Sequence, residues 1–83
     1  MGLHLGAEWV VPYRQVLAIL DLHTADSPDT REFLRRAREQ NAVITVPEDA
    51  PRSAVIVMDE AGTQRVYLSP VSSVTLKQRS LFI

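Results

Sequence analysis

The fold is decided by residues 53–73, whose sequence is SAVIVMDEAGTQRVYLSPVSS. Residues 54–58 form an unbroken apolar run with three successive β-branched side chains, which favours a strand covered on both faces. Residues 59–62 read DEAG, a turn sequence whose glycine can adopt a positive φ, and residues 65–68 predict the returning strand. The stretch therefore predicts a central β-hairpin. We interpret the apolar run as core structure with no active role of its own.

The hairpin leads into a short C-terminal helix. Pro70 ends the returning strand, because proline cannot donate a hydrogen bond to a strand ladder. Ser72 or Ser73 is then suited to cap a helix that runs through Arg79. The side chains expected to face inward are Leu76, Leu81 and Phe82.

The N-terminal part of the chain predicts a second, smaller hairpin. Residues 3–5 and 9–11 have strand character and are separated by a Gly-Ala turn. Residues 12–15 fit one helical turn that begins with proline, and residues 16–22 form another apolar strand. Strands joined by short turns in this way predict small antiparallel sheets.

A single long helix occupies the middle of the chain. Ser27 is suited to be its N-cap, with Pro28 at the first helical position, and the helix should end near Gln40. One face carries the apolar side chains Phe33, Leu34 and Ala37, and another carries the arginine stripe Arg31, Arg35 and Arg38. Residues 42–46 predict a further strand, and residues 48–52 a loop before the central hairpin. The expected class is α+β, with one central helix and a short C-terminal helix.

The composition predicts a single small domain that assembles with copies of itself. The chain has 83 residues, no cysteine, 46% hydrophobic residues and a net charge of −1. Such a chain is marginally stable alone and has no disulfide, so self-association is the expected way to cover its apolar strands, 17–20 and 54–58. No apolar run is long enough for a membrane span, and strand-like residues follow Met1 at once. We therefore expect a cytoplasmic protein.

The residues that could carry catalysis form no recognisable site. His4 and His23 are the two histidines, and the spacing of His23 from Asp21 and Asp26 matches no pattern of metal ligands. The serines of the C-terminal segment are accounted for by capping and strand termination, and no glycine-rich phosphate loop is present. The sequence therefore predicts no enzyme activity, no cofactor and no metal.

The arginines are the remaining candidates for a binding surface. The stripe on the central helix is interpreted as a solvated face, because acidic residues lie on the same helix. Arg14 and Arg52 instead lie in a turn and a loop next to strands. Arginines in such places can reach phosphates without disturbing a core.

Three segments carry a resemblance to a known family. They read HLG at residues 4–6, SPDTREFLRRA at residues 27–37 and YLSPVSSVTLKQR at residues 67–79. In these segments, and in order over nearly the whole chain, the sequence resembles the bacterial extracellular-matrix regulator family, RemA and RemB. It is most similar to the RemB branch.

The resemblance implies a compact α+β subunit that assembles into a closed ring. RemA-type relatives are DNA-binding regulators of biofilm-matrix genes, and their rings present arginines to DNA. Arg14 lies about one residue from the position of a family arginine. Where the family has an arginine pair, this chain has Ala50 and Pro51, followed by Arg52. The resemblance thus implies Arg14 and Arg52 as nucleic-acid-binding residues.

Two functions remain open from the sequence. One is a non-enzymatic regulator that forms a homo-oligomeric ring and binds double-stranded DNA. The other is an oligomeric scaffold that binds a protein or peptide and not DNA. Neither function calls for a cofactor, a metal, a small-molecule substrate or a membrane.

Overall fold

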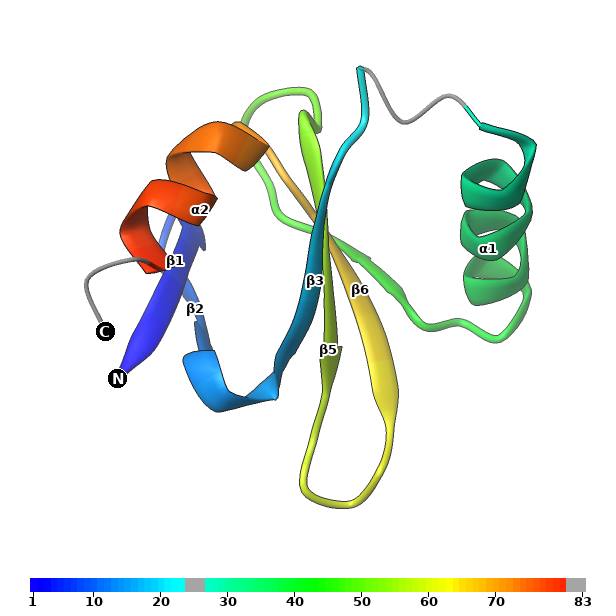
Figure 1. Ribbon diagram of the computed structural model, residues 1–83, viewed down its shortest axis with the longest axis horizontal. Coiled ribbons are helices and arrows are strands. Elements are labelled where there is room, and N and C mark those ends of the chain that lie inside the picture. The colour runs from blue at the N-terminus through cyan, green and yellow to red at the C-terminus, as the bar shows by residue number, and fades with distance from the viewer. Residues whose placement is uncertain (24–26, 81–83) are drawn as a thin grey trace.

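A computed structural model describes residues 1–23 and 27–80, and its elements follow the expected order along the chain (Figure 1). The elements are β1 (Gly2–Gly6), β2 (Trp9–Pro12), the 3-10 turn η1 (Tyr13–Gln15), β3 (Val16–Asp21), α1 (Pro28–Glu39), β4 (Val43–Thr45), β5 (Ser53–Met58), β6 (Gln64–Ser69) and α2 (Ser73–Ser80). The α+β class and the two expected helices are confirmed.

The central hairpin of β5 and β6 forms the middle of a four-stranded sheet with the order β3-β5-β6-β4. β5 pairs antiparallel with both β3 and β6, and Gly62 has a φ of 82° in the β5–β6 turn, as the sequence predicted. The remaining strands, β1 and β2, form a separate antiparallel pair.

The expectation of purely antiparallel sheets is wrong at β4, which runs parallel to β6. Since β3 is antiparallel to β5 and β5 to β6, β3 and β4 point in the same direction. Two strands of one sheet that point the same way need a crossover between them, which is usually helical. α1 provides this crossover, returning the chain to the end of the sheet where β3 begins (Figure 1).

The sheet separates two hydrophobic layers (Figure 1). On one side lie the β1–β2 hairpin and α2, with a core of Leu3, Leu5, Val11, Val46, Val55, Val57 and Leu76. On the other side lies α1, with a core of Ala37, Ala54, Val66 and Leu68, packed against Phe33 and Leu34 among others. β5 supplies residues to both cores, which confirms that this strand is covered on both faces.

The other strand expected to be covered on both faces, at residues 17–20, is not covered within one chain. β3 is an edge strand, and the side chain of Leu17 is 58% exposed. The register shifts between Val16 and Ala18, which leaves Leu17 as the extra residue of a bulge. The apolar run predicted a strand correctly, but an edge position leaves one side of it open.

The helix caps follow local sequence. Ser27 Oγ accepts from the backbone N–H of Thr30 at 3.1 Å and begins α1, and Ser72 Oγ accepts from that of Thr75 at 3.2 Å and begins α2. α1 ends at Glu39, one residue before the predicted position. Leu76 is fully buried, as predicted. The other two residues predicted to face inward on this segment, Leu81 and Phe82, lie outside the described residues.

Two buried serines, Ser53 and Ser69, connect the layers, and we call this pair the serine junction. They face each other across β5 and β6. Ser53 Oγ donates to the carbonyl of Val71 at 2.7 Å. Ser69 Oγ donates to the carbonyl of Leu5 at 2.5 Å and accepts from Val71 N–H at 3.0 Å. The junction therefore fixes the N-terminal hairpin and the loop before α2 onto the end of the sheet.

Candidate functional site

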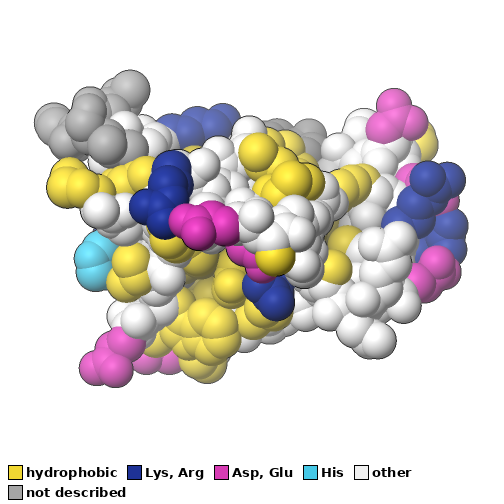
Figure 2. All heavy atoms as spheres, turned by 90° about the horizontal axis from the view of Figure 1, so that it is seen from below, with side chains coloured by type: hydrophobic (Ala, Val, Ile, Leu, Met, Phe, Trp, Pro, Cys, Tyr) yellow, Lys and Arg dark blue, Asp and Glu magenta, His cyan; other side chains and the backbone are white. Residues whose placement is uncertain are grey.

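Arg14 lies on the surface, in the turn η1 between β2 and β3. Pro12 has a φ of −62° and a ψ of 133° and serves as the N-cap of this turn. The Arg14 side chain is 73% exposed, and its Nη2 lies 2.5 Å from Oε1 of Glu60 in the β5–β6 turn. Figure 2 views the molecule from the end where this turn lies, and basic and acidic side chains are in contact there. Arg14 is thus accessible, but a carboxylate already neutralises part of its charge.

Arg52 lies at the other end of the sheet. Its backbone N–H donates to the carbonyl of Ser69, and its own carbonyl accepts from the N–H of Leu22. The side chain is exposed and has no ion pair among the described residues. β3 and β5 pair along their whole length, so Arg14 and Arg52 are separated by six strand residues, or roughly 20 Å. The structure does not bring the two arginines together within one chain.

The arginine stripe of α1 is a solvated face, as the sequence predicted. Arg31, Arg35 and Arg38 are all exposed. Arg35 forms ion pairs with Glu32 and Glu39, and Arg36 Nε lies 3.0 Å from Glu32 Oε1. Hydrogen bonds from Arg35, and secondarily from Arg36, lower the pKa of Glu32 to about 2. Acidic and basic groups alternate on this face, so it offers no uniform positive field.

The histidines form no metal site in the part of the chain that the structure describes. The backbone N–H of His23 donates to Asp21 Oδ1 at 2.8 Å, so this pair shapes a turn. Asp26, the third member of the cluster weighed from the sequence, lies outside the described residues. Within residues 1–23 and 27–80 no three His, Asp or Glu side chains gather closely enough to hold a metal ion.

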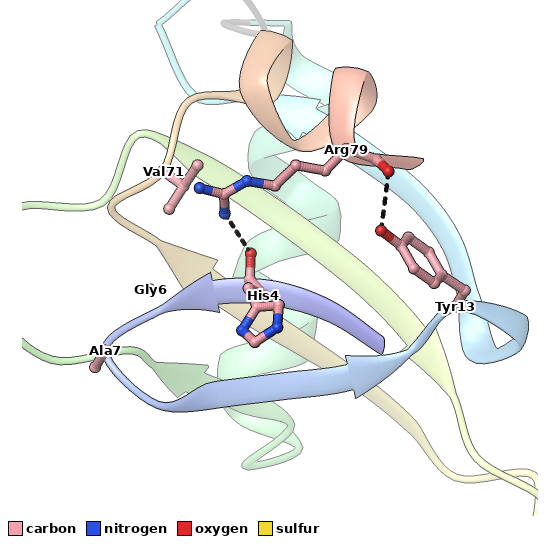
Figure 3. Close-up of a pocket in the computed structure, with 6 residues that line it drawn as sticks. All are labelled: His4, Gly6, Ala7, Tyr13, Val71 and Arg79. Atoms are coloured by element: carbon pink, nitrogen blue, oxygen red, sulfur yellow. Dashed lines mark hydrogen bonds between the residues drawn. The ribbon is translucent and has the colours of Figure 1, made fainter. Parts of the chain in front are cut away.

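A pocket that the sequence did not predict lies between the N-terminal hairpin and α2, and we call it the α2 pocket (Figure 3). It is an open hollow with a volume of about 560 Å³, and it is lined by His4, Gly6, Ala7, Tyr13, Val71 and Arg79. Arg79 Nη1 donates to the His4 carbonyl at 2.9 Å, and Tyr13 Oη donates to the Arg79 carbonyl at 3.0 Å. These contacts join residues 75 and 66 positions apart, which no local pattern could predict.

A tight backbone approach shapes one side of the α2 pocket. Gly6 has a φ of 112°, in the region that favours glycine. A Cβ at this position would lie 3.0 Å from Cγ of Pro70. The glycine therefore allows the end of β1 to pack directly against the loop that precedes α2.

Comparison with known proteins identifies the family. Residues 3–80 match the RemA-like family, described as extracellular matrix regulatory protein A-like. The chain belongs to the RemA-like family. This RemA-like chain is 35% identical to extracellular matrix regulatory protein B of Bacillus subtilis (strain 168) over 83 residues. The match covers all of this chain and 94% of that relative. The resemblance drawn from the sequence is confirmed.

Arg14 and Arg52 were inferred from the positions of family arginines, and both are accessible in this RemA-like subunit. Sequence reasoning missed Glu60 as the partner of Arg14 and Arg79 as part of a pocket. Among the described residues of the RemA-like chain, no helix has the length and apolar content needed to cross a membrane.

Proposed function

We propose that this RemA-like protein is a non-enzymatic regulator of extracellular-matrix genes that acts in the cytoplasm as a homo-oligomeric ring and contacts DNA through Arg14. The observation that carries the proposal is the match along the whole chain to a relative named as an extracellular matrix regulatory protein. Arg52 is the second proposed contact.

Self-association is supported by the open side of the sheet. β3 is an edge strand of six residues, so one row of its backbone N–H and C=O groups is not used by the sheet. Leu17 projects from it with 58% of its surface exposed, and Trp9 and Val10 on β2 are 37% and 48% exposed. An open strand edge and exposed apolar side chains both favour contact with a second copy of the chain.

DNA contact is supported by the position of Arg14 on an exposed turn. A guanidinium there can hydrogen-bond a phosphate without any change in the core. A ring would repeat this arginine once per subunit, so a single side chain per chain becomes a circle of positive charge. Binding of this kind depends on phosphate contacts and weakens steeply with salt.

The scaffold is the second candidate, and two observations favour it. Glu60 pairs with Arg14, and the net charge of the chain is −1. Arg14 and Arg52 also lie at opposite ends of β3. On this alternative the oligomer binds a protein or peptide, and its arginines remain ordinary surface residues.

A salt-series mobility shift with long duplex DNA separates the two functions. Arg14→Ala should weaken binding and make the log–log salt dependence shallower, because it removes one phosphate contact per subunit. The loss should exceed that of one contact, since the ring multiplies it. Arg38→Ala is the matched control, because Arg38 is exposed on α1 and has no ion pair among the described residues. It should leave the salt slope unchanged.

Wild-type protein that fails to shift DNA at about 50 mM salt, where phosphate contacts are strong, would refute DNA binding and leave the scaffold. Assembly is tested separately by light scattering across micromolar concentrations. A monomer mass throughout that range would refute the oligomer in both functions.

A further inference from the structure

The α2 pocket has the size and the construction of a small-molecule site. Its walls come from the N-terminal hairpin, the turn η1 and the α2 segment, which meet only in the folded chain (Figure 3). Its volume of about 560 Å³ falls within the range of roughly 300–1,000 Å³ that is typical of ligand pockets. The pocket therefore has room for a compact organic molecule.

Arg79 gives the pocket a positive charge that the described residues do not neutralise. Arg14, Arg35, Arg36 and Arg65 each pair with a carboxylate. Arg79 instead donates to a neutral carbonyl, that of His4, and none of the described residues that line the pocket is acidic. One amino group of the guanidinium is used in this bond, and within residues 1–23 and 27–80 its remaining N–H groups have no partner and can meet a ligand.

The guanidinium is also held in place before any ligand arrives. Its Nη1 donates to the His4 carbonyl on β1. The backbone of the same residue is fixed as well, because the Arg79 carbonyl accepts from the Tyr13 hydroxyl. Figure 3 shows the arginine side chain lying along the pocket between Val71 and His4. A cation that is already ordered loses less conformational entropy when it binds an anion.

The remaining lining residues differ in character from the arginine. Val71 and Ala7 offer aliphatic groups, and Tyr13 offers an aromatic ring. His4 lines the β1 side, where its backbone carbonyl accepts from Arg79. A pocket that joins one fixed cation to apolar and aromatic walls suits a ligand with an anionic group attached to an apolar or ring-containing body.

We propose that the α2 pocket binds a small organic anion, with its phosphate or carboxylate on the Arg79 guanidinium and its apolar part against Tyr13 and Val71. The planar guanidinium can meet either anion with two parallel hydrogen bonds. Arg14 does not line this pocket, and the proposal does not depend on DNA binding.

Ligand-observed saturation-transfer NMR on the full chain tests the proposal at constant ionic strength. Phenyl phosphate and benzoate are the probes that combine both parts, and phenol is the neutral probe. We expect saturable binding of phenyl phosphate or benzoate with a Kd of about 1 mM or tighter, and clearly weaker binding of phenol. The comparison of the two anions shows whether the site prefers phosphate or carboxylate.

Arg79→Gln should raise the Kd of the anionic probe by about tenfold or more, because the variant loses a charge-assisted contact. Lys77→Gln is the matched control, because Lys77 is an exposed cation of the same helix that does not line the pocket. It should change the affinity by less than about twofold. Arg79→Lys, which keeps the charge without the planar fork, should bind with intermediate affinity.

Three results would overturn the proposal. They are no saturable binding of either anion up to about 10 mM, equal binding of phenol, and an equal loss in the Lys77 and Arg79 variants. If Arg79→Gln does not fold, Arg79→Lys and the comparison of charged with neutral probes on the wild-type protein decide the question.

Discussion

Replacing Ser69 by alanine should destabilise the protein far more than the loss of one hydroxyl on the surface. Ser69 is fully buried, and its Oγ serves the Leu5 carbonyl and the Val71 N–H at once. Alanine would leave both backbone groups without their partner. An unsatisfied buried group costs about 1–3 kcal/mol, and the Val71 contact is only partly buried, so the total should be about 2–4 kcal/mol.

Urea unfolding followed by tryptophan fluorescence measures this loss. Trp9 is the sole tryptophan, and its ring packs edge-on against Tyr67 with the ring centroids 6.1 Å apart. The signal therefore reports on the N-terminal hairpin, which Ser69 holds against the sheet. Wild type and variants should be compared at one protein concentration, because self-association would add to the apparent stability.

Ser80→Ala is the matched control. Ser80 Oγ donates to the Lys77 carbonyl at 2.7 Å on the exposed last turn of α2, so its removal should change stability by less than about 0.5 kcal/mol. If Ser69→Ala lowers the free energy of unfolding no more than Ser80→Ala does, the serine junction does not stabilise the protein as proposed.

The remaining predictions concern α1. Ser27→Ala should lose about 1 kcal/mol in urea melts through loss of the N-cap, and an unchanged midpoint would contradict the capping geometry. Leu34→Ala should lower the free energy of unfolding by about 2 kcal/mol, the lower end of the range for core truncations, because Leu34 is half-buried. Arg35→Ala should lower it by less than about 1 kcal/mol. Equal losses would show that the apolar and charged faces of α1 are assigned wrongly. The ion pairs lower the pKa of Glu32 in the folded protein and so stabilise it. This stabilisation is fully present above the pKa of glutamate in the unfolded chain, about 4.3, and is lost as the pH falls toward the folded-state pKa of about 2. The difference in unfolding midpoint between wild type and Glu32→Gln should therefore shrink over that acidic range, and a difference independent of pH would refute the ion pairs.

Local signals in the sequence predicted most of the elements of the fold. Ser27 and Ser72 mark helix starts because their side-chain oxygens can accept a hydrogen bond from a free backbone N–H of the first helical turn. Proline and glycine mark turns by their backbone preferences. The direction of β4 was not predictable in this way. A run of apolar residues has the same pattern in a parallel and an antiparallel strand, and only the crossover through α1 decides between them.

The candidate site was predictable only in part. The family resemblance and the turn sequence pointed to Arg14 as an exposed cation, and it is exposed. Its partner Glu60 is 46 residues away, and Arg79 and His4 are 75 residues apart, so these contacts depend on how the sheets stack. Sequence periodicity carries information about neighbours on one element and none about such pairs.

The serine junction also determines what kind of cross-link this chain uses. With no cysteine, the protein joins segments 64 residues apart through hydroxyl-to-carbonyl bonds. A disulfide would restrict the unfolded chain and would break under reducing conditions. A hydrogen bond from a buried hydroxyl does not restrict the unfolded chain, because it forms only when both segments are folded. It also does not break under reducing conditions. The N-terminal hairpin can consequently open and close again without any covalent chemistry, and the exchange of its amide protons would measure how often it does so.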